Sequence, residues 1–192
     1  MLDRYLILAS ASPRRRELLD RCDVPFTVVV AAVDESADES ESPSEYVLRV
    51  AHAKARAVQQ RHPDAFVLGA DTSVVLDGEL LGKPADAEQA RAMLRKLSGR
   101  EHEVLSAVAL ACPDGRRTER LSSTRVEFGL LPEAWIEAYI ATGDCMDKAG
   151  AYGIQNQAGL WIRRISGSYT GVVGLPLFET ADLLREAGLI LD

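Results

Sequence analysis

Residues 5–19 read YLILASASPRRRELL, an apolar run followed by a polar turn and helix-forming residues. Tyr5–Ala9 is a short apolar run of the kind that forms a buried strand. Pro13 stands beside helix-forming residues, which predicts a helix that begins just after it. The stretch therefore predicts a strand, a tight turn and a helix in direct succession.

Strand and helix signals alternate along the rest of the chain. Strand patterns cover residues 26–33, 66–70 with an extension over 73–76, 101–111 and 121–128. Capping, proline and glycine signals predict helices from residue 43 to about 61, from 86 to about 97, from 132 to 143 and from about 176 to 187. Asp77-Gly78 and Pro113-Asp114-Gly115 are turn sequences that join neighbouring strands as hairpins. This order predicts an α/β protein with a mixed β-sheet.

The composition is that of an ordinary globular protein. With 192 residues, 47% hydrophobic and 27% charged, the chain is long enough for one domain over residues 1–192 with its own core. Its net charge of −7 and the lack of a long basic tract argue against nucleic acid as a partner. A small, locally basic pocket is still compatible with this acidic exterior, because salt screens distant charges more than near ones.

Cysteine usage and hydropathy favour the cytoplasm. Cys22, Cys112 and Cys145 are far apart and lack C-x-x-C spacing, which argues against a disulfide framework or a zinc site and for a reducing compartment. Residues 1–5 place an acid before only a short apolar run, unlike a secretory signal. Every apolar stretch is shorter than a bilayer-spanning helix, so we expect no membrane partner.

Residues 10–15, SASPRR, lie between the first predicted strand and helix. Free backbone N–H groups and the dipole at a helix start favour an anion, so Ser10, Arg14 and Arg15 are candidates for a phosphate clamp. Alternatively, Ser12 caps the helix and the arginines lie on a solvated face. Local chemistry leaves both alternatives open.

Lys54 and Asp71 are candidates for the interior of a site. Lys54 lies four residues from both Val50 and Val58, which puts its stem on the apolar face of its helix. Its ammonium group either passes the core edge into water or ends at a buried anion in a pocket. Asp71 follows the apolar run Phe66–Ala70, so we expect it at the end of a central strand, where ligands gather in open α/β sheets.

Three further residues supply polar groups. Glu35 follows Val33 at the end of the second predicted strand and is a candidate for a second carboxylate at the same sheet edge. Lys83 lies in a tight segment before Pro84. It is either a positioned cation or an exposed loop lysine. The Gln155 amide both donates and accepts hydrogen bonds, which suits the edge of uracil or thymine, or a turn.

The spacing of the histidines argues against a zinc centre built from histidine side chains. His52, His62 and His102 show no ligand spacing with each other or with cysteine. A histidine-built zinc site is therefore not expected.

Taken in order along the chain, these segments resemble the Maf family of nucleotide pyrophosphatases. The similarity runs from Leu6 almost to the C-terminus, which makes it specific. Its pieces are Ser10–Arg15 with Glu17–Leu19, Glu35, Tyr46-Val47, Lys54-Ala55, Gly69–Thr72, Gly82–Pro84, Leu97–Gly99 with His102, Asp147–Gly150, Tyr152–Gln155, and Gly167-Ser168 leading to Val173–Leu177.

The resemblance implies a fold, an activity and roles for residues. The fold is a mixed, twisted β-sheet flanked by helices, with a cleft for nucleotide, as in Maf- and ITPase-like proteins. Residues 151–155 resemble the branch that prefers dTTP and UTP, whereas another branch acts on 7-methylguanosine triphosphate. The family pattern implies Asp71 as proton acceptor, Arg14, Thr72 and Gln155 as specificity positions, and a homodimer.

The chain departs from the family pattern at a few positions. Ser106 stands where threonine is usual, Asp144 where glutamate is usual, and Cys145-Met146 are atypical. These departures bear on fine substrate preference, modified pyrimidine nucleotides included, and leave the reaction unchanged.

The expected reaction needs both signs of charge. A triphosphate brings about four negative charges, so the site must supply cations and a divalent metal, normally Mg²⁺ or Mn²⁺. Glu35 and Asp71 are expected to bind this metal and to activate water for attack at the α-phosphorus, with the division of labour between them open. The residues expected to hold the phosphates are Arg14, Arg15, Lys54 and Lys83.

Two other functions stay open. The chain is either this pyrophosphatase, with a house-cleaning role in nucleotide metabolism, or a non-catalytic nucleotide- or partner-binding regulator of septum formation. A pyrophosphatase for 7-methylguanosine triphosphate is the second alternative. Assays of pyrophosphate release over a panel of nucleotides discriminate among the three.

Overall fold

The computed structural model describes residues 5–38 and 40–191, so the expectation for residues 1–4 lies outside the described part. Its strands are β1 (Leu6–Leu8), β2 (Phe26–Val28), β3 (Phe66–Leu76), β4 (Glu79–Leu81), β5 (Glu101–Ala111), β6 (Arg117–Phe128) and β7 (Ile162–Ser166). Its helices are α1 (Pro13–Leu19), α2 (Pro43–Gln59), α3 (Ala87–Leu97), α4 (Glu133–Ala141), α5 (Tyr169–Val173) and α6 (Leu177–Glu186). Short 3-10 turns are η1 (Asp20–Cys22), η2 (Ala149–Ala151) and η3 (Gln157–Trp161). None of the described helices is both long enough and apolar enough to cross a bilayer.

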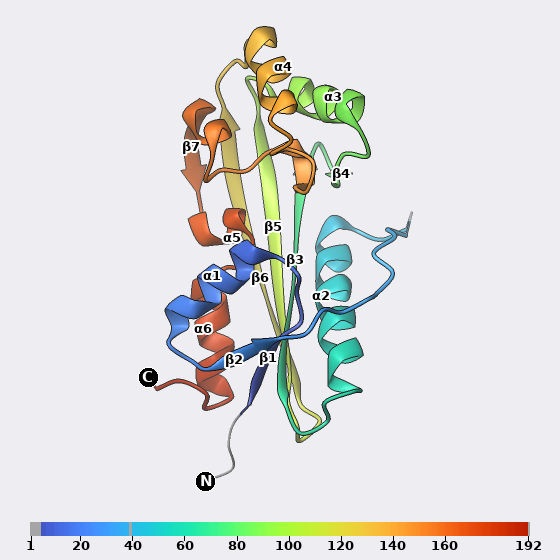
Figure 1. Cartoon of the computed structure of the whole chain (residues 1–192), viewed down its shortest axis with the longest axis vertical. Helices are drawn as coiled ribbons and strands as arrows, with labels where there is room; N and C mark the ends of the chain where they lie inside the picture. Colours follow the sequence, from blue (N-terminus) through green and yellow to red (C-terminus); the bar gives the residue numbers. More distant parts are fainter. Residues whose placement is uncertain (1–4, 39, 192) are drawn as a thin grey trace.

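Within the described residues, seven strands form one mixed sheet. Its order is β2-β1-β3-β5-β6-β7, and β4 pairs with β3 beyond the end of β1. β1 is parallel to β2 and β3, whereas β3, β5, β6 and β7 pair in antiparallel fashion. The long strands β3, β5 and β6 run through the length of the molecule, with helices packed around both ends (Figure 1). The predicted α/β class with a mixed sheet flanked by helices is confirmed.

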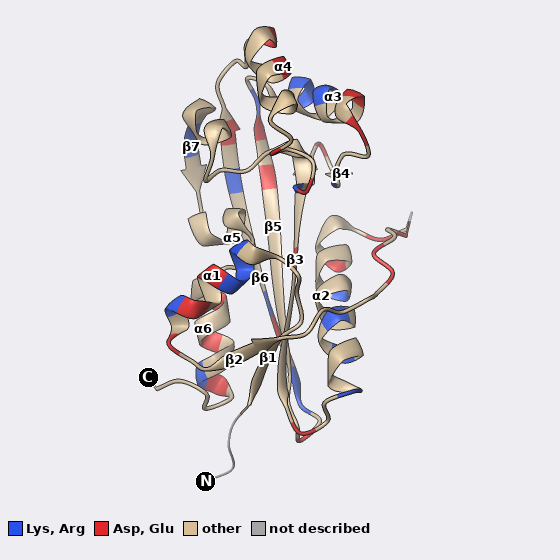
Figure 2. Cartoon of the chain, viewed as in Figure 1, with Lys and Arg blue, Asp and Glu red and all other residues tan. Residues whose placement is uncertain are grey.

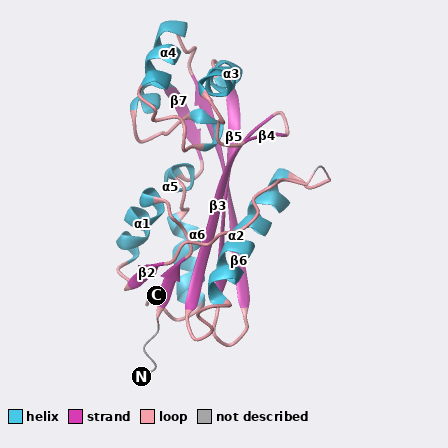
Figure 3. Cartoon of the chain, turned by 45° about the vertical axis from the view of Figure 1, so that its right-hand side comes forward, coloured by secondary structure: helices cyan, strands magenta, loops and turns pink. Residues whose placement is uncertain are grey.

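Both faces of the sheet are covered at the end that holds β1. Leu6 and Leu8 pack in one cluster with Leu18 of α1 and with α6. Ile7, between them, packs with α2 on the opposite face (Figure 3). Because successive strand side chains point to opposite faces, a strand covered on both sides appears as an unbroken apolar run. This explains the apolar run over residues 5–9.

A second core lies at the other end of the long strands. Leu94 of α3, Ile136 and Tyr139 of α4 and Phe128 of β6 belong to one buried cluster. We call this half, with α3, α4 and β7, the α4 lobe, and the half with β1, β2, α1, α2 and α6 the β1 lobe (Figure 1). The long strands β3, β5 and β6 connect the two lobes.

A capping box begins helix α2. The Ser42 hydroxyl accepts a hydrogen bond from the Glu45 amide, and the Glu45 carboxylate accepts one from the Ser42 amide in return. Pro43 occupies the first helical turn, where its missing N–H costs nothing. The predicted start of this helix is confirmed, and it fixes which residues of α2 face the sheet.

Gly69 lets helix α2 lie unusually close to β3. A Cβ atom on Gly69 would lie 2.2 Å from the Ala51 carbonyl oxygen and 2.8 Å from the Ala55 nitrogen. Only a residue without a side chain fits this approach. As a result, Lys54 of α2 reaches Asp71, two positions further along β3.

Several predicted strand ends are wrong. β2 ends at Val28 instead of Val33, because its neighbour β1 has only three residues to pair with it, so Glu35 lies in an irregular loop. Asp71 does not end its strand, since β3 runs unbroken through it and pairs it with Ala107 of β5. Strand β7 was not predicted, because Arg163 and Arg164 interrupt the apolar pattern there, and the five-residue helix α5 was not predicted either.

Candidate active site

The cavity lies at a gap in the pairing of β3. On the edge away from β5, β1 pairs with β3 up to Leu68, and β4 pairs with it from Val74 onward. Among the described strands, none pairs with this edge over residues 69–73. A cavity of about 600 Å³ opens beside the gap, and residues of both lobes line it. Its volume is in the range of small-molecule sites.

The structure brings every predicted site residue to this one cavity. They come from the turn after β1, from α1, α2, β3 and three loops, so the site unites segments far apart in sequence. The predicted residues that line the cavity are Ser10, Arg14, Arg15, Glu35, Lys54, Asp71, Thr72, Lys83 and Gln155. Their chemical roles remain predictions.

Lys54 lies between the two predicted carboxylates. Its Nζ is 2.9 Å from Asp71 Oδ1 and 3.0 Å from Glu35 Oε1. Lys54 is 8% and Asp71 6% exposed, whereas the Glu35 side chain is 46% exposed. Of the two alternatives for Lys54, it therefore ends at a buried anion, the Asp71 carboxylate, and it also contacts the exposed Glu35 carboxylate. These anions are the protein's own carboxylates, so its charge already has partners.

Tyr46 of α2 holds the Glu35 loop. Its hydroxyl donates a hydrogen bond of 2.9 Å to the Glu35 carbonyl oxygen. Burial, then the nearby charges of Asp71 and Glu35, raise the pKa of Tyr46 to about 12. The hydroxyl is therefore a proton donor at neutral pH, and it positions the loop without acting as a base.

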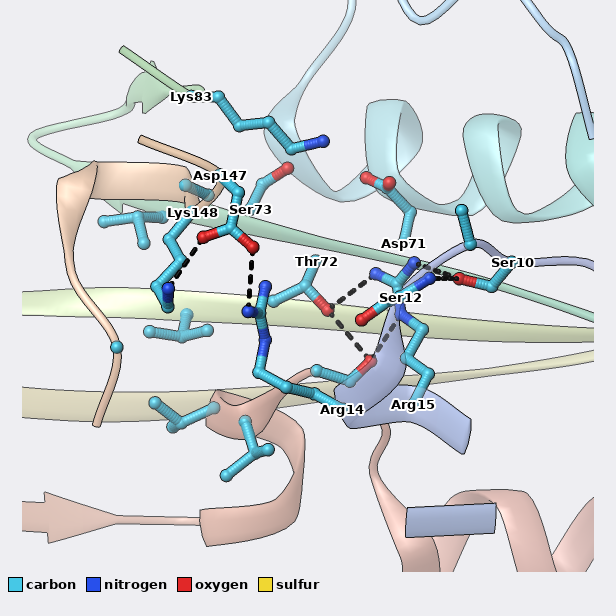
Figure 4. Close-up of a pocket in the computed structure, with 18 of the residues that line it drawn as sticks. Ser10, Ser12, Arg14, Arg15, Asp71, Thr72, Ser73, Lys83, Asp147 and Lys148 are labelled. Carbon is cyan, nitrogen blue, oxygen red and sulfur yellow. Dashed lines mark hydrogen bonds and ion pairs between the residues drawn. The ribbon is translucent and has the colours of Figure 1, made fainter. Parts of the chain in front are cut away.

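Arg15 connects three parts of the cavity wall. Its Nε donates to the Gly174 carbonyl at 2.8 Å, and its Nη atoms donate to the hydroxyls of Ser10 and Thr72 at 3.3 Å (Figure 4). Burial lowers the pKa of Arg15, partly opposed by Asp71 and Glu35, yet a guanidinium stays charged at neutral pH. Among the described residues no carboxylate pairs with it, so its charge is available to a ligand.

The two alternatives for residues 10–15 divide between the side chains. Ser12 occupies the position before α1 but makes no capping hydrogen bond, and Ser10 instead accepts from the Ser12 amide at 3.2 Å. Arg16 is exposed, as expected of a solvated face, whereas Arg14 and Arg15 line the cavity.

Asp147 and Lys148 line the cavity and had no predicted role. Arg14 Nη1 lies 3.0 Å from Asp147 Oδ2, and Lys148 Nζ lies 2.7 Å from Asp147 Oδ1 (Figure 4). Burial alone would raise the pKa of Asp147, but hydrogen bonds from Lys148 and Arg14 outweigh it and lower the pKa. The Arg14–Asp147 pair thus links the β1 lobe to the α4 lobe. The adjacent acid and base in the family motif were the only sequence signal for it.

The cavity is basic within an acidic protein. Of the described residues that line it, five are basic and three are acidic, in a chain of net charge −7. Basic residues colour the first turn of α1, beside the cavity, while both signs are interspersed elsewhere (Figure 2). Lys83 has no ion pair among the described residues, and its ammonium points toward the space between Ser73 and Asp71 (Figure 4). A polyanion fits this charge distribution.

His102 anchors one aromatic wall of the cavity. Its Nε2 lies 2.7 Å from the hydroxyl of Tyr152, which lines the cavity, and its ring stacks on Phe128. Burial lowers the pKa of His102 to about 4. The imidazole is therefore neutral at pH 7 and packs in the core.

Acid is expected to destabilise the wild-type protein more than it destabilises the His102→Phe variant. Unfolded His102 takes up a proton near pH 6.5 and folded His102 only near pH 4, so between these values the unfolded state binds more protons. The free energy of unfolding therefore falls as pH falls, by about 2–3 kcal/mol from this residue between pH 7 and 4.5. Urea unfolding of both proteins at the two pH values measures the difference. An identical pH dependence would contradict a buried neutral His102.

The carboxylates of Glu35 and Asp71 suit a metal ion that binds together with a phosphate ligand. Among the described residues, no group of three or more His, Cys, Asp or Glu side chains is arranged to hold a metal by itself. The two carboxylates do converge on one point, since both lie within 3.0 Å of Lys54 Nζ. Mg²⁺ is commonly bound by one or two carboxylates together with substrate phosphates. The donor set therefore fits a divalent cation shared with a phosphate ligand.

The fold is similar to that of a solved protein. The solved structure of a HAM1 protein from Coxiella burnetii aligns with 95% of this chain and 99% of its own, with a TM-score of 0.53 at 17% identity. At that identity the likeness concerns the fold alone. It confirms the predicted fold, a mixed sheet flanked by helices.

The chain belongs to the Maf family: the family's sequence profile, described as Maf-like protein, matches residues 5–187. A dTTP/UTP pyrophosphatase from Symbiobacterium thermophilum is 54% identical over 185 residues, which are 96% of this chain and 95% of the relative. A dTTP/UTP pyrophosphatase from Myxococcus xanthus is 52% identical over 187 residues, with coverage of 97% and 94%. The family resemblance drawn from the motifs is confirmed.

Proposed function

We propose that the protein hydrolyses dTTP and UTP to the monophosphate and pyrophosphate, with modified pyrimidine nucleotides as further substrates. The observation that carries the proposal is the basic cavity in which Lys54, Asp71 and Glu35 lie within contact distance. Support also comes from relatives about half identical over nearly the whole chain, which are dTTP/UTP pyrophosphatases.

The phosphates are held by cations from both lobes. Arg15 and Lys83 bind them most directly, because neither has a carboxylate partner among the described residues. Arg14 and Lys148 share Asp147 and can turn part of their hydrogen bonding to an incoming phosphate. A metal-bound triphosphate carries about two negative charges, which the surplus of basic over acidic lining residues offsets.

Water is activated beside β3. Asp71 accepts a proton from the water that attacks the α-phosphorus, and Lys54 keeps the Asp71 carboxylate in place. Glu35 and Asp71 hold a divalent cation, Mg²⁺ or Mn²⁺, which when bound neutralises phosphate charge and polarises the phosphorus–oxygen bonds. Lys54 therefore mainly orders the two carboxylates. It contributes less to phosphate binding than the sequence predicts.

A nucleotide panel tests the proposal. Purified protein is incubated with dTTP, UTP, CTP, GTP and 7-methylguanosine triphosphate in Mg²⁺ or Mn²⁺, and products are separated by ion-exchange chromatography. We expect UMP and pyrophosphate from UTP, and no product when EDTA is present. Release of orthophosphate would indicate another reaction, and no turnover of any nucleotide would favour the non-catalytic regulator.

Replacing Gln155 by alanine is expected to lower the preference for UTP over CTP by about tenfold. UTP and CTP differ in the donor and acceptor pattern at the pyrimidine edge, and Gln155 lines the cavity with an amide that can do both. The measurement is kcat/KM for each nucleotide. Gln157→Ala, an exposed glutamine two residues on, is the matched control. An unchanged ratio in Gln155→Ala would move base recognition elsewhere.

The setting of the enzyme is part of the proposal. We place it in the cytoplasm as one domain over residues 1–192, where its nucleotide substrates occur. Cys22, Cys112 and Cys145 are free thiols, as suits a reducing compartment. We also propose a homodimer, which the family resemblance implies, and light scattering after size exclusion measures it.

A further inference from the structure

Asp144 is a hydrogen-bond hub behind the segment that carries Gln155. Its Oδ2 accepts from the Tyr139 hydroxyl at 2.6 Å. Its Oδ1 accepts from Asn156 Nδ2 at 2.7 Å and from Lys148 Nζ at 3.1 Å. Burial alone would raise the pKa of Asp144, but these three hydrogen bonds outweigh it and lower the pKa. The hub is therefore a carboxylate at neutral pH.

The neighbours of Gln155 on both sides are tied to this hub. Asn156, the next residue, donates directly to Asp144. On the other side, the Gly153 amide donates to the Tyr139 hydroxyl at 3.2 Å, and that hydroxyl donates to Asp144. Asn156 also donates from its backbone to the Gly153 carbonyl at 3.2 Å, which closes the turn around Gln155.

Lys148 packs along the same turn. A Cβ atom on Gly153 would lie 2.6 Å from Lys148 Cε, so the lysine stem fills the space that a side chain would take. Its ammonium is shared between Asp144 and Asp147, and Asp147 also holds Arg14. The position of the turn is thus coupled to the cations at the phosphate end of the cavity.

We infer that Asp144 is a positioning residue that sets where the Gln155 amide lies and thereby sets the selectivity for the pyrimidine base. Lys148 and residues 152–156 line the cavity, but Asp144 does not, so it acts through its neighbours and not through the substrate. The inference rests on the proposed function and adds the group that determines its specificity.

The test compares three single variants, Asp144→Ala, Asn156→Ala and Gln155→Ala, with the wild type. It also includes the double variant that combines Asp144→Ala with Gln155→Ala. Asp144→Ala is expected to lower the UTP/CTP ratio of kcat/KM about tenfold, through a higher KM for UTP with kcat within about threefold. Combined with Gln155→Ala, it is expected to lower the ratio no further than Gln155→Ala alone, because both changes remove one interaction. Asp114→Ala, a carboxylate bonded to Arg116 in the distant β5–β6 turn, is the matched control and should keep the ratio.

The outcomes separate this inference from the proposed function. A folded Asp144→Ala with an unchanged ratio, or an effect that adds to that of Gln155→Ala, would overturn the inference while UTP hydrolysis stands. If Asp144→Ala fails to fold, Asn156→Ala decides, since it removes one exposed hydrogen bond to the hub and should lower the ratio in the same direction. A wild-type protein without a preference for UTP removes the proposed function, and the inference with it.

Discussion

Asp71→Asn is expected to lower kcat for UTP hydrolysis by about 100-fold or more, with a modest change in KM. Asparagine has nearly the same shape and can still accept a hydrogen bond from Lys54, but it cannot take up a proton from water. Phosphate binding by Arg15 and Lys83 is untouched, so the loss should fall on the chemical step. Steady-state kinetics at saturating Mg²⁺ measure it, and wild-type turnover in Asp71→Asn would remove Asp71 from the mechanism.

Glu35→Gln serves as the matched comparison for Asp71→Asn. The two acids contact the same ammonium group, but Glu35 is far more exposed. If Glu35 mainly holds the metal, its loss should raise the Mg²⁺ concentration needed for half-maximal rate, and excess Mg²⁺ should restore much of kcat. Asp71→Asn should resist such rescue. The reverse pattern would exchange the two roles.

Lys54→Met is expected to lower the free energy of unfolding by about 3 kcal/mol and to abolish most activity. The change keeps an aliphatic stem on the apolar face of α2 but leaves the Asp71 carboxylate buried without its cation. Removing one member of a buried ion pair costs more than the pair contributes, because the remaining charge is uncompensated. Urea unfolding measures the stability, and pyrophosphate release measures the activity.

Two further variants test whether the effect of Lys54→Met comes from the loss of the buried ion pair. Lys96→Met removes an exposed lysine paired with Glu79 and should change stability by no more than about 0.5 kcal/mol. The double variant Lys54→Met with Asp71→Asn should recover part of the lost stability, since no unpaired charge stays buried. A double variant as unstable as the sum of the single ones would show that Lys54 acts by packing alone.

Local signals were enough for most of the framework. The apolar runs before Asp71 and Ser10 encode strands covered on both faces, and the Ser42–Glu45 capping box encodes the start of α2. Such signals act within a few residues, so a single sequence contains them in full. The lysine spacing that put Lys54 on the apolar face of α2 is of the same kind, and the structure agrees.

The place of Asp71 within its strand needed information that no local pattern holds. A polar residue after an apolar run predicts a strand end, yet β3 continues because β5 pairs with it on the other edge. Its polarity instead marks where β1 stops and β4 has not begun, which depends on segments far away in the chain. The gap in pairing, and not the end of the strand, makes room for the cavity.

The network around Asp144 was out of reach for a different reason. Tyr139, Lys148 and Asn156 all lie within twelve residues of Asp144, but they do not share one helix or strand. Their convergence depends on how the irregular segments on both sides of η2 return to Tyr139 of α4. Irregular segments have no periodic pattern, so the sequence alone does not predict which of their polar side chains meet.

Hydrolysis of UTP in water labelled with ¹⁸O shows which phosphorus atom the water attacks. If the cavity directs an Asp71-activated water onto the α-phosphorus, mass spectrometry should find the label in UMP and none in pyrophosphate. Label in the pyrophosphate would mean attack at the β-phosphorus, and the arrangement of acids and cations proposed around β3 would be contradicted.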